Sequence, residues 1–198
     1  MNLPNKLTVS RLVLTVFFLV AVFVPFPLSN TLALTFFAIA SITDFFDGRI
    51  ARERKLITNF GILMDPLADK ILTCSAFIAL VERGVLDEKV GVQVYAWMVV
   101  IIVARELAIT GLRMMAASKN VVLAAEGYGK HKTISQMVSI SALLVLVSVN
   151  EGGELGTKIF TPWVSWFAWV TLWLAVVLTA LSGSLYLWNN REIYLNDA

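Results

Sequence analysis

The sequence predicts an all-helical integral membrane protein with about six transmembrane helices and a short N-terminal segment at the membrane interface. Of its 198 residues, 58% are hydrophobic and only 15% are charged, which is far more apolar than an ordinary soluble domain. About six spans of ~20 residues and their loops fill this length, so we expect one membrane-embedded domain over residues 1–198. The net charge of +2 is too small to indicate a nucleic-acid partner.

The spans appear as apolar runs separated by short polar stretches. They are expected at about 12–24, 31–46, 60–80, 92–112, 134–149 and 162–188. Ahead of the first run, Pro4 is placed to begin a helix, and Lys6 and Arg11 are expected among lipid headgroups. The connections include a turn of mixed charge at 82–89 and a glycine-rich loop at 150–158.

Positive charge is concentrated on one side of the predicted bundle. Eleven of the sixteen lysine and arginine residues fall at span ends that share this side: Lys6, Arg11, Arg49, Arg52, Arg54, Lys55, Arg113, Lys119, Lys130, Lys132 and Arg191. Arg83, Lys89 and Lys158 fall on the other side. Because basic connections stay in the cytoplasm, the sequence predicts a multi-pass protein of the inner membrane whose two termini face the cytoplasm.

Four aspartates flank the connection between the second and third spans. Asp44 and Asp47 are three residues apart. Asp65 and Asp69 are four apart, so each pair lies on one face of its helix. Near the bilayer centre each aspartate costs roughly 2.5–3.5 kcal/mol on insertion scales, so the cluster needs a neutralising partner. Carboxylates from two helices suit two Mg²⁺ or Mn²⁺ ions. Ion pairs with nearby arginines are the alternative, but such weak interfacial pairs need no fixed spacing.

The same stretch carries a motif of eight residues at fixed spacing, D-x2-D-G-x2-A-R-x8-G-x3-D-x3-D. Its members are Asp44, Asp47, Gly48, Ala51, Arg52, Gly61, Asp65 and Asp69. At all eight positions this pattern resembles the signature of the CDP-alcohol phosphatidyltransferase family. The fold of that family, with six membrane helices, agrees with the number of spans expected from the apolar runs.

The resemblance implies roles for the motif residues. The four aspartates would bind the two divalent ions, and Asp69 would also accept the proton of the acceptor hydroxyl. Gly48 and Ala51 leave one helix face bare, so that a base and ribose can approach the backbone, and Gly61 does the same on the facing helix. The residues expected to bind the CDP-lipid are Asn5, Thr8, Asp44, Gly48, Ala51, Arg52 and Gly61.

A second group of charges lies in the fourth span and at the start of the fifth. Arg105 and Arg113 are eight residues apart, a little over two turns, so they share a helix face. Together with Lys130 they predict a phosphate pocket, because the planar fork of arginine fits phosphate oxygens. Snorkelling toward headgroups is the alternative for Arg113 and Lys130. Glu106 is not expected to pair with Arg105, because adjacent side chains diverge around a helix.

Longer runs point to one branch of the family. NLPNKLTVSR, LMDPLADK, ARELAITGLR and GKHKT, which fall within residues 2–133, resemble the branch that makes phosphatidylglycerophosphate. The resemblance implies a homodimer that transfers the phosphatidyl group of CDP-diacylglycerol to glycerol 3-phosphate and releases CMP. It associates Asn5 and Thr8 with the nucleotide. The residues it associates with the acceptor phosphate are Arg105, Arg113 and Lys130.

Other functions stay open. Within the family, the chain could be a cardiolipin, phosphatidylserine or phosphatidylinositol-phosphate synthase, although the arginines disfavour serine, which has no phosphate. Intramembrane acids are also typical of cation transporters, but nothing in residues 100–198 repeats the aspartate cluster, as an inverted repeat would. His131, between two lysines, is expected to be solvated. The tryptophans of 163–173 are expected to anchor the last span at the interface.

Overall fold

The structure is a computed structural model that describes most of the backbone. The described residues are 3–54, 59–88, 91–119, 121, 123, 128–149, 151 and 154–195. Within these ranges, the side chains of residues 3–5, 7, 44–54, 59–63, 65–66, 69, 85, 128–130 and 154–159 are not among those described.

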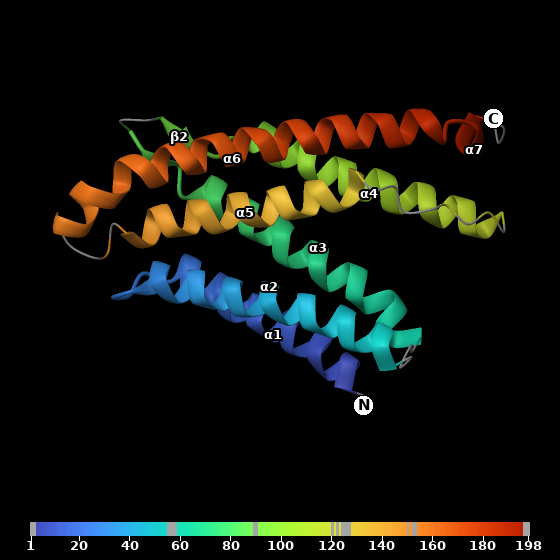
Figure 1. Ribbon diagram of the computed structural model, residues 1–198, viewed down its shortest axis with the longest axis horizontal. Helices are drawn as coiled ribbons and strands as arrows, with labels where there is room; N and C mark the ends of the chain where they lie inside the picture. The colour runs from blue at the N-terminus through green and yellow to red at the C-terminus, as the bar shows by residue number, and fades with distance from the viewer. Residues whose placement is uncertain are drawn as a thin grey trace.

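Six long helices make up most of the described chain and run roughly along one axis (Figure 1). They are α1 (Leu3–Phe23), α2 (Ser29–Arg54), α3 (Asn59–Glu82), α4 (Ala96–Ser118), α5 (Tyr128–Val149) and α6 (Glu154–Asn189). The one-turn helix α7 (Glu192–Leu195) follows α6. Helix α1 packs against α2 and α3, while α6 packs against α4 and α5. The mostly helical fold is thus confirmed, and both ends of the chain lie at the same end of the bundle (Figure 1).

Several helices extend beyond the apolar runs that predict them. Helix α1 begins at Leu3, close to the predicted helix start at Pro4, and the segment ahead of the first apolar run forms its first turns. Helix α2 continues to Arg54, through basic residues predicted to be a connection. Helix α6 begins at Glu154 and has Pro162 in its interior, where the sequence predicts its start. Hydropathy marks what a helix buries, whereas arginine, lysine and glutamate are good helix formers and let a helix continue past its apolar part.

A short β-ribbon separates α3 from α4, where the sequence predicts only a turn. Strand β1 (Val85–Asp87) pairs antiparallel with β2 (Val92–Gln93), with an irregular register. Gly84 and Gly91 directly precede the two strands with φ of 71°, a left-handed conformation that glycine adopts at little cost. Because β2 occupies the predicted start of the fourth span, α4 begins only at Ala96.

The helices pack through alternating large and small side chains. The rings of Phe18 on α1 and Phe37 on α2 lie 5.9 Å apart between centroids, and both are fully buried. Ala33 and Ala40, also on α2, are fully buried and let neighbouring backbones approach closely. Lipid tails are as apolar as leucine, so close packing of this kind is what holds helices together in a bilayer.

The outward surface of the helices is unusually apolar for a protein in water. The side chain of Trp163 is 82% exposed and that of Leu107 is 65% exposed, with many other large apolar residues half exposed. Large exposed apolar patches mark interaction or membrane surfaces. By length and composition, two helical segments of the described chain could cross a membrane, His131–Val149 and Phe160–Asn189. Six spans are not confirmed by this criterion; α4 has sufficient length but contains three charged residues.

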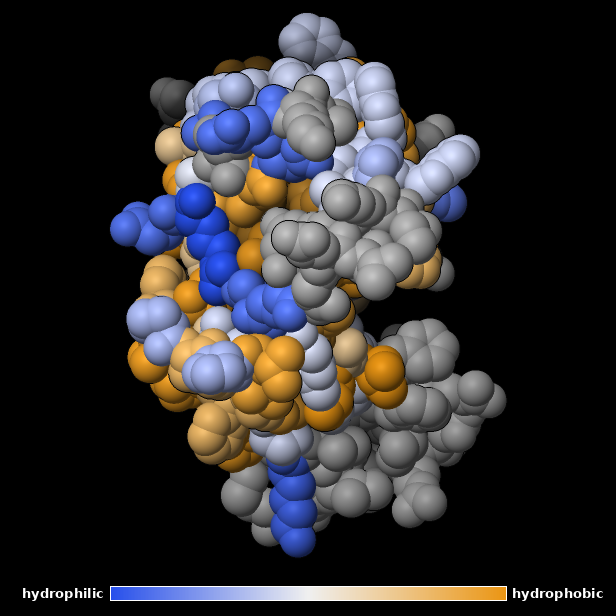
Figure 2. All heavy atoms as spheres, turned by 90° about the vertical axis from the view of Figure 1, so that its left-hand side faces the viewer, coloured by the Kyte–Doolittle hydropathy of each residue, from blue (hydrophilic) through white to orange (hydrophobic). Residues whose placement is uncertain are grey.

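Hydrophilic side chains form a band across the end of the bundle that holds the α1–α2 and α5–α6 connections (Figure 2). Glu151 there accepts the backbone N–H groups of Asn30 at 2.9 Å and Thr31 at 3.0 Å, and the Thr31 hydroxyl at 2.9 Å. These N–H groups begin α2 and have no partner within their helix, and a negative charge is favourable at that position. Arg83 donates to the Val22 carbonyl at 2.9 Å, at the last turn of α1. Glu151 thus provides hydrogen-bond acceptors for the first N–H groups of α2, and Arg83 provides a donor for a last carbonyl group of α1.

The capping contact makes stability depend on pH. Burial alone would raise the pKa of Glu151, but the hydrogen bonds from Asn30 and Thr31 and the charge of Arg83 hold it below the ordinary value of 4.5. A carboxyl group with a lowered pKa stabilises the folded state above its unfolded pKa, and this contribution is lost as pH falls through the folded pKa.

We predict that Tm in detergent micelles falls less below pH 4.5 in Glu151→Gln than in the unchanged protein, because the variant has no carboxylate to protonate. Thermal unfolding scans from neutral pH downward would measure this. Glu88→Gln, an exposed acid in the turn after β1, serves as the control and should follow the unchanged protein. The capping role is contradicted if Glu151→Gln and Glu88→Gln give the same curve.

Candidate active site

The four motif aspartates lie on two consecutive helices, on either side of residues 55–58. Asp44 and Asp47 belong to the C-terminal half of α2. Asp65 and Asp69 belong to the N-terminal half of α3. These two halves lie at the end of the bundle that also holds both chain termini (Figure 1). The backbone therefore brings the two pairs to one region of the molecule.

The side chains of the four aspartates, which are predicted to bind the metal ions, lie outside those described. The same is true of the other predicted site residues Asn5, Gly48, Ala51, Arg52, Gly61 and Lys130. Among the side chains that the structure describes, no three acids, histidines or cysteines could hold a metal, and the four aspartates are not among them. Carboxylate oxygens from two adjoining helices are a donor set that fits a hard divalent ion.

Arg105 lies between α4 and α6 with its side chain only 11% exposed. Its Nη2 donates to the hydroxyl of Ser182 on α6 at 3.4 Å. A Cβ atom added to Gly183 would lie 2.6 Å from Arg105 Cγ, so the arginine stem packs directly on the α6 backbone. Its Nε is buried and has no hydrogen-bond partner among the described residues. The two terminal nitrogens of the guanidinium group are therefore held by Ser182 and Glu106, and its Nε–H can still donate a hydrogen bond.

Glu106 is buried on α4 and pairs with cations from two helices. Its Oε1 forms a salt bridge with Lys132 on α5, and lies 3.3 Å from Arg105 Nη1. The prediction that Glu106 does not pair with Arg105 is wrong. Neighbouring Cα–Cβ bonds diverge by about 100° on a helix, but both side chains are long enough to turn back toward each other. One carboxylate thus serves two cations.

Lys70 links the aspartate helix α3 to the same part of α4. Its Nζ donates to the Thr110 hydroxyl and lies 3.5 Å from the Glu106 carbonyl oxygen. The Thr110 hydroxyl in turn donates to that carbonyl oxygen at 2.7 Å. Lys70 directly follows Asp69, about 1.5 Å along the helix axis. The charged cluster on α4 therefore touches α3 at the level of a motif aspartate.

Arg113 contacts α6 two turns beyond Arg105. Its Nε donates to the Tyr186 hydroxyl at 3.3 Å, and its guanidinium carbon lies 5.6 Å from the centre of the tyrosine ring. Tyr186 is only 4% exposed, whereas Arg113 is exposed. Both arginines thus face α6, which agrees with the prediction that they share one face of their helix.

The described side chains of this cluster carry more positive than negative charge. Arg105 and Lys132 pair with the carboxylate of Glu106, and Lys70 lies near its backbone carbonyl oxygen. Charge buried among apolar helices is costly unless it is paired. Phosphate is an anion that arginine forks bind in two-pronged fashion, so the cluster contains groups of the kind that bind it.

Comparison with known proteins identifies the family. Residues 1–181 match the family model described as CDP-alcohol phosphatidyltransferase. The chain belongs to this family. Three relatives bear the name CDP-diacylglycerol–glycerol-3-phosphate 3-phosphatidyltransferase. The protein of Bacillus subtilis is 39% identical, covering 96% of each chain. Those of Rickettsia bellii and Salmonella typhimurium are 34% and 32% identical, covering 93% and 94% of this chain and 93% of each relative.

Some residues of this CDP-alcohol phosphatidyltransferase lie where the sequence does not predict them. Arg11, predicted among headgroups, is fully buried. Because α1 begins at Leu3, Arg11 lies two turns inside the helix rather than at its end. Thr8, on the same helix, is also fully buried, and its place near the nucleotide stays a prediction. His131 is exposed, which agrees with the prediction of a solvated side chain.

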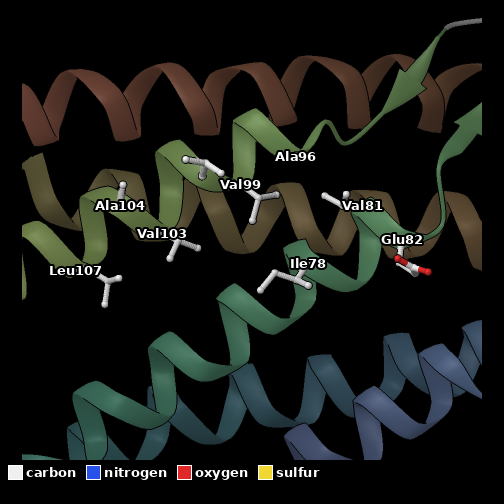
Figure 3. A pocket seen from close by; sticks show the side chains of 9 residues that line it. Ile78, Val81, Glu82, Ala96, Val99, Val103, Ala104 and Leu107 are labelled. Atoms are coloured by element: carbon white, nitrogen blue, oxygen red, sulfur yellow. The ribbon is translucent and has the colours of Figure 1, made fainter.

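A separate groove of about 510 Å³ opens between α3 and α4 of this phosphatidyltransferase (Figure 3). Its lining is apolar apart from Glu82 at one end: Ile78, Val81, Ala96, Val99, Val100, Val103, Ala104 and Leu107. A groove lined by these groups provides no cation for a phosphate. Its chemistry suits an acyl chain or an apolar helix.

We predict that Glu106→Gln destabilises the protein by about 3–5 kcal/mol, the range for breaking a buried ion pair. The change leaves Arg105 and Lys132 without their shared counter-ion. Adding Lys132→Met should recover part of the loss, because it removes one of the two stranded charges. Unfolding free energies in mixed detergent micelles, measured for both single variants and the double variant, test the coupling.

Glu192→Gln on the exposed helix α7 makes the same chemical change outside the cluster, and it should leave stability within ±0.5 kcal/mol. Strict additivity of Glu106→Gln and Lys132→Met would show that the two side chains do not stabilise each other.

Proposed function

We propose that the protein is an integral membrane enzyme that transfers the phosphatidyl group of CDP-diacylglycerol to glycerol 3-phosphate, forming phosphatidylglycerophosphate and CMP. The observation that carries this proposal is the cluster of cations on α4 and α5, which meets the aspartate helix α3 through Lys70. The names of the relatives, whose sequences align with almost the whole chain, support the same reaction.

The motif aspartates would supply the reacting centre. Asp44, Asp47, Asp65 and Asp69 would hold two Mg²⁺ or Mn²⁺ ions, which neutralise a diphosphate and its leaving group when bound. Asp69 takes the proton of the acceptor hydroxyl, whose oxygen attacks the β-phosphorus of the CDP-lipid. The bond from that phosphorus to the bridging oxygen breaks, and CMP leaves with the bridging oxygen. The residues proposed to receive the CDP-lipid are Asn5, Thr8, Asp44, Gly48, Ala51, Arg52 and Gly61.

The acceptor phosphate is proposed to bind Arg105, Arg113 and Lys130. Arg105 supports this, because its Nε is buried and has no hydrogen-bond partner among the described residues, and such a donor favours a ligand that accepts a hydrogen bond. Serine carries no phosphate for the arginine forks to bind. Among other members of the family, synthases that use phosphorylated polyols remain the nearest alternative.

We further propose that α1 to α6 all cross the inner membrane, with the aspartates and both termini on the cytoplasmic side. The common position of the two termini in Figure 1 and the basic residues at span ends support this arrangement. A homodimer is proposed from the family resemblance. The α3–α4 groove gives no reason to prefer a second copy over an acyl chain, so we assign it no occupant.

The reaction itself provides the first test. Purified protein in detergent micelles with CDP-diacylglycerol and Mg²⁺ should release CMP with glycerol 3-phosphate, but not with glycerol, serine, inositol phosphate or phosphatidylglycerol. EDTA should abolish the reaction, and Mg²⁺ or Mn²⁺ should restore it, because the aspartates act through the ions. Full activity in EDTA would overturn the metal assignment, and preference for another acceptor would reassign the substrate.

We predict that Arg113→Ala raises KM for glycerol 3-phosphate about ten- to a hundredfold, because a hydrogen bond to a charged group contributes roughly 1.5–3 kcal/mol. KM for CDP-diacylglycerol should change little. Arg113→Lys should recover only part of the loss, since a point charge cannot make the two-pronged contact. Steady-state kinetics with each substrate varied in turn give both constants.

Arg191→Ala is the matched control for this prediction. Arg191 lies between α6 and α7 and also stacks on an aromatic ring, with its guanidinium carbon 4.9 Å from the centre of the Trp188 ring. It is exposed and lies outside the cluster, so both KM values should be unchanged. If Arg113→Ala weakens only the CDP-lipid, Arg113 belongs to the donor site.

A further inference from the structure

One strip of α6 faces both arginines of the proposed acceptor pocket. Ser182 and Gly183 lie against Arg105, and Tyr186, one turn further on, lies against Arg113. The last third of the sequence contains no motif that predicts such a role. The strip is recognisable only from the packing of α6 on α4.

Gly183 determines where the Arg105 side chain can lie. The 2.6 Å from a Cβ at this position to Arg105 Cγ is closer than side chains tolerate. The clash involves the stem next to the helix rather than the flexible end of the arginine. Its far end is held by Ser182 and Glu106. A methyl group at Gly183 would therefore displace the guanidinium group from its present position.

Tyr186 orients the side chain of Arg113, as Gly183 does for Arg105. Its ring packs with Ile109 and Leu112, two buried residues of α4 that lie between the arginines in sequence. This packing fixes the ring, and the hydroxyl accepts from Arg113 Nε while the ring lies near the guanidinium carbon. Cation–aromatic contacts of this kind orient a guanidinium group without neutralising its charge. Arg113 is thus oriented and still able to bind an anion.

We infer that Gly183 and Tyr186 are positioning residues of the acceptor pocket, which hold Arg105 and Arg113 in the orientations that bind the acceptor phosphate. This inference rests on the proposed function. Neither residue touches the substrate. Each acts through its arginine, and the pocket is therefore built from α6 as well as from α4 and α5.

The decisive comparison uses two glycine-to-alanine variants. Gly183→Ala should raise KM for glycerol 3-phosphate roughly tenfold, the effect of weakening one charged hydrogen bond, and leave KM for CDP-diacylglycerol unchanged. Gly111→Ala is the matched control on α4, because no described atom lies within 4 Å of a Cβ added there. Its kinetics should match those of the unchanged protein. Tm for both variants, measured in the same micelles, reports whether each is folded.

A double variant separates positioning from general packing. Arg105→Ala removes both Cγ and the guanidinium group, so adding Gly183→Ala should not raise KM for glycerol 3-phosphate any further. Should Gly183→Ala fail to fold, Tyr186→Phe keeps the ring and removes only the hydroxyl. It should raise the same KM about two- to tenfold, as expected for one neutral hydrogen bond.

Three results would overturn the inference: equal kinetics of Gly183→Ala and Gly111→Ala, an equal rise of both KM values, or a further rise in the Arg105→Ala background. Failure of the proposed function gives a different result. In that case the unchanged protein and Gly111→Ala would both fail to use glycerol 3-phosphate.

Discussion

Charge buried between apolar helices must be paired, and in this protein one carboxylate meets that requirement for several helices. The salt bridges of Glu106 join α4 to α5 and hold Arg105, while its carbonyl oxygen lies within reach of Lys70 on α3. Removing an ion from water costs several kcal/mol even after relaxation. Each of these charged side chains is therefore stable in the bundle only beside its present partner. The arrangement of three helices around the site therefore depends on where Glu106 sits.

The long apolar helix α6 contributes to the same arrangement without carrying any charge in its spanning part. Gly183 provides space for the stem of Arg105, and Tyr186 provides a ring and a hydroxyl for Arg113. Small residues allow close approach of helices in a membrane, and polar side chains hydrogen-bond across the interface. Here both properties act on the cations of the proposed pocket, so the packing of α6 on α4 also builds that pocket.

How much the sequence predicts depends on how far apart the interacting residues lie in the chain. The aspartate motif, the succession of long helices and the common face of Arg105 and Arg113 follow from spacings of a few residues. The contact of Lys70 with Thr110 spans 40 residues and that of Arg105 with Ser182 spans 77, and no local pattern encodes either. Periodicity gives the face of a helix but not its partner.

Other predictions are wrong because they use only the sequence position of a residue, without the length of its side chain or the extent of its helix. Adjacent residues on a helix start in different directions, yet Arg105 and Glu106 are long enough to meet. Arg11 follows an unusually polar start of the chain, which hydropathy interprets as an interface, although the helix is already two turns long at that point. Hydropathy likewise does not detect the β-ribbon, because strands of two or three residues are too short to show an alternating pattern.

The order of residues on α3 suggests why the two halves of the proposed site can work together. Asp69 and Lys70 are consecutive, so their positions lie about 100° apart around the helix. The face that carries Lys70 to Thr110 on α4 is therefore distinct from the face that carries position 69. A rigid helix that presents acids on one face and is fixed to the cation cluster by another keeps the donor and acceptor sites in constant register. Attack of a hydroxyl on a phosphorus needs its reacting atoms held close and aligned. The Lys70 contact is the described interaction that could maintain this register.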